Sequence, residues 1–231
     1  MLLPEPLKNM LRGPRGASNG PAVNRAPVRS FFPKGAEETV ATRASRGLEE
    51  FFGYIRGQSG LTILDLGGAT QQNVNFITSL GHRLYSEDFL RLLGETFGLE
   101  STVDQANPGQ IEYFMKQALD YQEQHFDGVL VWDVLEYLAP ALLTAVVERL
   151  HKIVRPKSYM LAFFHSDAKL EAVPYYTFRI QELKTLQVAQ RGSRRPAQLF
   201  NNRSLEKLFG NFDSVKFFLT RESLREVIVK V

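Results

Sequence analysis

An acid followed by two glycines is the feature of this sequence best suited to binding a ligand. Residues 63–72 read ILDLGGATQQ, in which apolar residues lead into Asp65 and are followed by Gly67 and Gly68. Glycines have no Cβ, so main-chain N–H groups can approach a bound molecule closely, and a helix that begins after such a turn favours an anion. The segment therefore predicts a loop that binds a nucleotide-like ligand through Asp65, Gly67 and Gly68.

Three more acids follow apolar segments farther along the chain. Glu87 and Asp88 come after the short segment 82–86, and Asp133 comes directly after FDGVLVW at 126–132. The carboxyl ends of parallel strands meet at one edge of a sheet, where such folds bind their ligands. Glu87 and Asp88 are therefore candidates for cofactor contacts, and Asp133 for cofactor or substrate contacts. Capping of the following helix is an equal alternative for these acids.

His165 and Asp133 are the candidates for catalysis, and the sequence identifies no stronger one. His165 ends the apolar segment YMLAFFH at 159–165, at the same expected edge, where a histidine can act as a general base. The neighbouring Trp132 is expected in the core rather than in a stacking role. The chain has no cysteine, and its four histidines lack the spacing of a metal site, so no metal is expected.

Strands and helices must alternate along the chain to bring these residues together. Periodicity and turn signals predict helices at 48–55, 70–80, 89–97, 111–119, 140–154 and 204–209, and strands at 61–66, 82–86, 126–132, 159–165, 215–220 and 226–231. Thr70 is a predicted helix cap and Gly81 a predicted helix stop. This order predicts an α/β fold with a mostly parallel sheet, helices on both faces and a C-terminal antiparallel hairpin.

Composition divides the chain at about residue 46. Residues 1–46 carry eight Lys/Arg and three Asp/Glu among many prolines, and they predict a basic tail that is mostly disordered. A nucleic-acid or membrane arm is a less favoured interpretation of this tail, and an organellar presequence is an open alternative. The rest, at 47–231, is slightly acidic and long enough for one domain. No apolar run is long enough to span a membrane, and the lack of cysteine agrees with a cytoplasmic location.

An inserted basic segment at 168–203 separates the strand at 159–165 from the last helix. It carries seven Lys/Arg against two Glu, and 175–181 with 185–190 predict an added β-hairpin. Near the ligand edge, such a hairpin can cover the pocket and favour a small-molecule substrate with a carboxylate or phosphate. A solvated loop is the favoured alternative. Nucleic acid is a less favoured partner, because aromatic residues are not densely interleaved with the charges.

The combined pattern of residues 47–231 resembles the class I S-adenosylmethionine-dependent methyltransferases. The matching motifs are the acid and glycines from Asp65, an acid 22 residues later at Glu87, and FDGVLVWDVLEYL from Phe126. Arg155-Pro156 follows at the place of a further family turn. The resemblance implies a Rossmann-like sheet, S-adenosylmethionine as cofactor, contacts of the loop with the cofactor, and ribose binding by Glu87 or the neighbouring Asp88.

The sequence departs from the family at the loop. Members usually carry GxGxG, whereas only Gly67 is retained here and Ala69 and Gln71 replace the other two glycines. The third strand of the family is also not evident, since 111–119 has a helical pattern. The resemblance implies methyl transfer to an unidentified acceptor, with a non-catalytic module that has lost its cofactor as the alternative. A nicotinamide-dependent dehydrogenase is less favoured, because its GxGxxG pattern also requires a glycine at Gln72.

Overall fold

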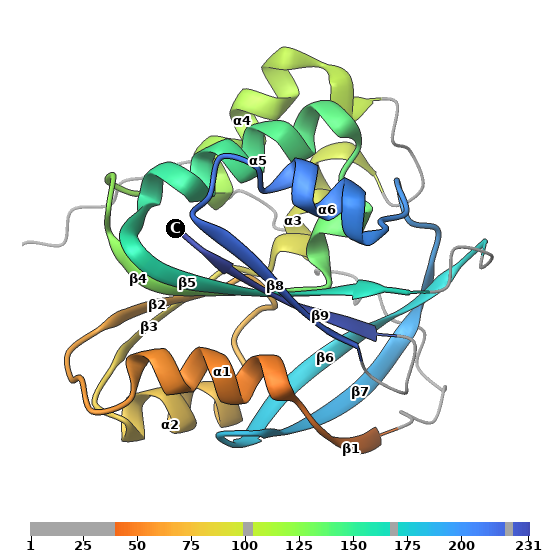
Figure 1. Ribbon diagram of the computed structural model, residues 1–231. Helices are drawn as coiled ribbons and strands as arrows, with labels where there is room; N and C mark the ends of the chain where they lie inside the picture. Colours follow the sequence, from red (N-terminus) through yellow and green to blue (C-terminus); the bar gives the residue numbers. More distant parts are fainter. Residues whose placement is uncertain (1–39, 99–103, 167–170, 220–223) are drawn as a thin grey trace, which may run out of the picture. The chain divides into compact units, whose positions relative to one another are not determined.

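A six-stranded sheet lies at the centre of the computed structural model, which describes residues 40–98, 104–166, 171–219 and 224–231. The strands lie side by side in the order β3-β2-β4-β5-β9-β8 (Figure 1). Their bounds are β2 Thr62–Asp65, β3 Arg83–Ser86, β4 Phe126–Trp132, β5 Val154–His165, β8 Ser214–Leu219 and β9 Leu224–Lys230.

The first four strands of this sheet are parallel, and the C-terminal pair is a hairpin. β2 pairs in parallel with β3 and β4, and β4 pairs in parallel with β5. β9 runs antiparallel to both β5 and β8. The predicted Rossmann-like fold with a C-terminal antiparallel hairpin is confirmed. Between β3 and β4 the described residues form no strand, in agreement with the helical pattern at 111–119.

Helices cover both faces of the sheet, as predicted. In Figure 1, α1 and α2 lie on one face, and α3, α4, α5 and α6 lie on the other. Thr70 caps α2 by accepting a hydrogen bond from the Asn73 amide, and Gly81 follows the helix with a positive φ of 81°. The helix bounds are α1 Arg46–Ile55, α2 Gln71–Ser79, α3 Phe89–Phe97, α4 Pro108–Ala118, α5 Pro140–Ile153 and α6 Asn202–Leu208, with 3₁₀ turns at Asp104–Ala106 (η2) and Val134–Tyr137 (η3).

A second, antiparallel sheet is built from the inserted segment and a strand from the predicted tail. β6 (Val173–Glu182) and β7 (Thr185–Arg194) form the predicted hairpin, and β1 (Val40–Ala44) pairs with β7. The predicted tail boundary at residue 46 is therefore wrong for Val40–Ala44. The short segment VATRA gives no distinct local strand signal, because the strand depends on pairing with distant residues. The prediction of disorder for residues 1–39 lies outside the described residues.

Glu226 on β9 joins this N-terminal strand to the main sheet. Its fully buried carboxylate accepts hydrogen bonds from the Gly47 amide at 2.6 Å, the Ser45 hydroxyl at 3.0 Å and the Arg43 guanidinium at 3.3 Å. A buried carboxylate with three donors fixes the start of α1 over β9. The small sheet then packs with α1 and α2 in one apolar cluster, while α3 to α6 share the cluster on the other face.

Candidate functional site

Asp65 ends β2 at the carboxyl edge of the sheet and is completely buried. Its Oδ1 accepts hydrogen bonds from the Gly67 amide at 2.8 Å and the Trp132 indole Nε1 at 2.6 Å, and its Oδ2 accepts one from Asn73 Nδ2 at 3.0 Å. Burial raises the pKa of the Asp65 carboxyl to about 6, although the three hydrogen bonds oppose that rise. Asp65 therefore orients the glycine loop through its hydrogen bond with the Gly67 amide.

The glycine loop packs directly on the end of β3. Gly68 has a φ of 84°, a conformation that favours glycine, and its amide donates to the Glu87 carbonyl at 3.1 Å. A Cβ added to Gly68 would lie 3.3 Å from the Asp88 side chain. The predicted acids after β3 are thus brought next to the predicted glycines.

Glu87 and Asp88 each have a partner within the protein. The Glu87 carboxylate accepts a hydrogen bond from the Tyr121 hydroxyl at 2.5 Å. Asp88 caps α3 by accepting from the Arg91 amide at 3.1 Å, so the capping alternative describes this residue. Ribose binding by either acid remains a prediction.

Asp133, Glu136 and His165 meet beyond the ends of β4 and β5. Glu136 is fully buried, and its two oxygens accept from the His165 amide at 2.7 Å and from His165 Nδ1 at 2.6 Å. Asp133 does not cap the following 3₁₀ turn with its side chain and instead accepts from the Tyr176 amide at 3.2 Å. Sequence reasoning missed Glu136, since a single acid within an apolar run does not indicate which way it points.

The Glu136 and His165 pair has the geometry of an oriented base. When Nδ1 donates to the carboxylate, Nε2 of the neutral ring carries the lone pair. In the described part of the chain, neither the buried Nε2 of His165 nor the buried hydroxyl of Tyr137 has a hydrogen-bond partner. This arrangement can accept a proton, and the catalytic role of His165 remains a prediction.

The hairpin of β6 and β7 covers the carboxyl edge, as expected for an insert that shields a pocket. Asn73 at the start of α2 donates to the Phe178 carbonyl at 3.1 Å and accepts from the Ile180 amide at 2.8 Å. The ring of Phe178 stacks on Trp132 with centroids 4.9 Å apart and planes at 4°. The solvated-loop alternative is therefore wrong for β6.

The residues expected to hold S-adenosylmethionine do not fit it in this conformation. A Cβ on Gly67 would lie 2.6 Å from Trp132 Cδ1, so the indole fills the space into which a ligand beside Gly67 would go. The acid Asp65 is inaccessible behind the same ring.

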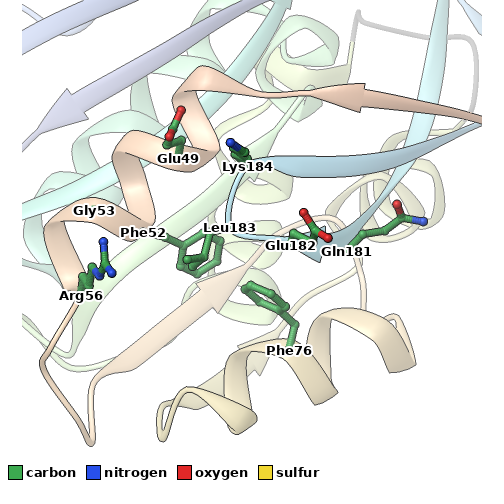
Figure 2. Close-up of a pocket in the computed structure, with 9 residues that line it drawn as sticks. All are labelled: Glu49, Phe52, Gly53, Arg56, Phe76, Gln181, Glu182, Leu183 and Lys184. Carbon is green, nitrogen blue, oxygen red and sulfur yellow. The ribbon is translucent and has the colours of Figure 1, made fainter.

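Two surface pockets lie outside this cluster of acids. One has a volume of about 500 Å³ and lies between α1, α2 and the turn that joins β6 to β7, with Phe52 and Phe76 as its aromatic residues (Figure 2). The other, of about 430 Å³, lies beside α1 and Phe218. Neither pocket includes Asp65, Glu87, Asp88 or Asp133.

The described ranges contain neither a cluster of metal-ligand side chains nor a membrane-spanning helix. In those ranges, no three His, Asp or Glu side chains are grouped in a way that could hold a metal ion. Among the helices that the structure describes, none is both long enough and apolar enough to cross a bilayer.

We expect Asp133→Asn to remove part of the pH dependence of stability. Burial, followed by the nearby charge of Glu136, raises the pKa of Asp133 to about 7, while His165 opposes the rise. A carboxyl whose pKa is raised on folding stabilises the protein below its unfolded pKa, and this contribution is lost as the pH rises through about 7. Urea denaturation gives the unfolding free energy of each protein at about pH 5 and at about pH 8. The decrease between these two pH values should be smaller in the variant than in the wild type, by about 2 kcal/mol.

The matched control is Asp213→Asn, because Asp213 is exposed and its ion pair with Lys230 is on the surface. This control should keep the pH dependence of the wild type. Equal slopes for Asp133→Asn and the wild type would contradict the expected titration of Asp133.

Comparisons with known proteins find similarity only among solved structures, and only at low sequence identity. No family model matches the chain, and no curated protein sequence matches it. Among solved structures, an S-adenosylmethionine-dependent methyltransferase from Archaeoglobus fulgidus is similar at 15% identity and a TM-score of 0.47, over 80% of this chain and 91% of that one. The 1,6-didemethyltoxoflavin N1-methyltransferase from Burkholderia thailandensis, solved with 1,6-didemethyltoxoflavin and S-adenosylhomocysteine, is similar at 14% identity and 0.43, over 80% and 76%. Similarity at these TM-scores does not indicate which activity this chain has.

Proposed function

We propose that this chain transfers a methyl group from S-adenosylmethionine to a small-molecule acceptor, and that the described conformation is a closed one. The observation that supports this proposal is the meeting of three acids at one edge of the sheet. Asp65 is the last residue of β2, and Glu87 and Asp133 directly follow the neighbouring parallel strands β3 and β4. Ligands of Rossmann-like folds bind at this edge.

The acceptor is proposed to carry an anionic group. Arg194 on β7 lies over the ring of Tyr137, with its guanidinium carbon 5.5 Å from the ring centroid. Burial lowers the pKa of Arg194 from its usual value, which indicates a partly desolvated cation beside Tyr137. The Tyr137 hydroxyl in turn lies near the charges of Asp133 and Glu136. A desolvated guanidinium is suited to a carboxylate or phosphate.

A non-catalytic binding module is the second candidate function, and one observation favours it. The indole of Trp132 occupies the space beside Gly67, so the loop as described does not admit a nucleoside. If this closed arrangement is permanent, the chain keeps the fold without its cofactor.

Titration with S-adenosylhomocysteine, measured by calorimetry, separates these two functions. The methyltransferase proposal expects saturable binding by the wild type. Glu87→Gln should bind about tenfold more weakly, because a neutral amide replaces the charge-assisted hydrogen bonds that a carboxylate makes to ribose hydroxyls. The substitution retains an acceptor for Tyr121, so the fold should be preserved.

Asp213→Asn is again the control and should bind like the wild type, since Asp213 is exposed and forms its ion pair with Lys230 at the surface. Absence of binding by the folded wild type at millimolar ligand would favour the non-catalytic module. Equal binding by Glu87→Gln and the wild type would remove Glu87 from the proposed site.

A further inference from the structure

Trp132 has an unusual backbone conformation at the end of β4. Its φ is 57°, in the left-handed region that bulky residues rarely adopt. The pairing of β4 with β5 also shifts register between Leu130 and Trp132. Such irregularities redirect a side chain, and they persist only where the surrounding contacts hold them.

Contacts from three other strands hold the Trp132 side chain in place. Its indole N–H donates to Asp65 at the end of β2 at 2.6 Å. The ring stacks on Phe178 of β6 and lies 5.8 Å from the ring of Phe163 on β5, at an interplanar angle of 23°. Only 1% of Trp132 is exposed, so the predicted core location is confirmed.

The indole also explains why position 67 has no side chain. Gly67 has no positive φ, so its backbone does not require glycine. A Cβ at this position would instead lie 2.6 Å from Cδ1 and 2.9 Å from Nε1 of Trp132. The Gly67 amide and the indole N–H both donate to the same oxygen of Asp65. The space that glycine leaves free is therefore filled by a side chain of the protein itself.

We propose that Trp132 is an internal competitor for the ligand, and that a nucleoside binds beside Gly67 only after the indole has left Asp65. The inference rests on the proposed cofactor binding and identifies the residue that determines its affinity. Departure of the indole frees one acceptor position on Asp65 and opens the space beside Gly67. It also breaks the stacking with Phe178, which couples ligand entry to the hairpin that covers the site.

The chain contains a single tryptophan, so intrinsic fluorescence reports on position 132 alone. We expect the wild type to emit at the short wavelengths of a buried indole. Titration with S-adenosylhomocysteine should shift the emission to longer wavelength as the indole leaves its apolar stack. This readout does not depend on methyl transfer or on knowledge of the acceptor.

Calorimetric titration of two substitutions measures the competition directly. Trp132→Gly removes the ring and suits the positive φ, and it should bind S-adenosylhomocysteine at least about tenfold more tightly than the wild type, since a hydrogen bond to a carboxylate is no longer broken on binding. Trp132→Phe retains an aromatic ring without the N–H, so its affinity should lie between the two. Phe114→Ala, at a buried ring in the other apolar cluster, is the control for general loosening and should keep the affinity of the wild type.

The outcomes separate this inference from the proposed function. Saturable binding without an emission shift, and with equal affinity in all variants, would overturn the role of Trp132 while leaving cofactor binding in place. If Trp132→Gly bound the ligand and the other proteins did not, the indole would block the site completely in the wild type, which supports the inference. Absence of binding by every folded variant would overturn both proposals. If Trp132→Gly does not fold, two measurements still test the inference. These are the emission shift of the wild type on titration and the affinity of Trp132→Phe, which should exceed that of the wild type.

Discussion

Asp65→Ala is expected to lower the free energy of unfolding by about 3 kcal/mol near neutral pH. The substitution leaves three donors without an acceptor at a fully buried site, namely Trp132 Nε1, the Gly67 amide and Asn73 Nδ2. Each unsatisfied buried donor costs about 1–3 kcal/mol, and removal of a carboxylate that is itself penalised by burial offsets part of the sum. Urea denaturation followed by circular dichroism measures the change.

Two variants calibrate this result. Asp213→Ala removes a carboxylate whose side chain is 58% exposed and paired with Lys230, so its effect should stay below about 0.5 kcal/mol. Asp65→Asn retains one acceptor and should lie between the two alanine variants. If Asp65→Ala were as stable as Asp213→Ala, the hydrogen bonds at Asp65 would not hold the loop together.

Local sequence patterns were sufficient for the elements of the main sheet. The mainly apolar segment Phe126–Trp132 and the helical spacing of Phe89–Phe97 each match an element of the structure at both ends. In both cases the residues of the element itself carry the signal. The strand is buried on both faces and the helix along one stripe, and this burial determines which residue types occur. The same reasoning placed Asp65, Glu87 and Asp133 at one edge.

Features that depend on distant contacts could not be predicted in this way. β1 at Val40–Ala44 forms against β7, and β5 extends from Val154 rather than from residue 159 because its early residues pair beside β4. The pairing of Glu136 with His165 joins residues that are separate in sequence, through a turn whose direction the residue types do not specify.

The position of Trp132 shows the same limit at the site itself. From sequence, an aromatic residue at the end of a buried strand indicates core, and it is buried. Its approach to Gly67 depends on a positive φ and a register shift, which periodicity does not report. Ala69 and Gln71, which stand where the family has glycines, indicated an altered site. They did not indicate that the Trp132 side chain, at the end of β4, fills the space beside the loop.

A double-mutant cycle between Gly67 and Trp132 should reveal a coupling energy of about 2 kcal/mol. Gly67→Ala places a methyl group 2.6 Å from the indole, and overpacking of this kind costs about 1–3 kcal/mol. In a Trp132→Gly background the ring is absent, so the same substitution should cost close to nothing. Urea denaturation of the four proteins gives the coupling directly.

Gly128→Ala provides the matched control, because the added Cβ would lie 2.8 Å from the ring of Phe51 rather than from Trp132. Its cost should be the same with and without the indole. If Gly67→Ala were equally costly in both backgrounds, the glycine would be required by the loop backbone and not by the tryptophan. Coupling found in the Gly67 cycle and absent with Gly128→Ala would show that the indole fills the space beside Gly67. A ligand that binds there needs the same space. The contacts that stabilise the closed form would then lower the affinity for that ligand.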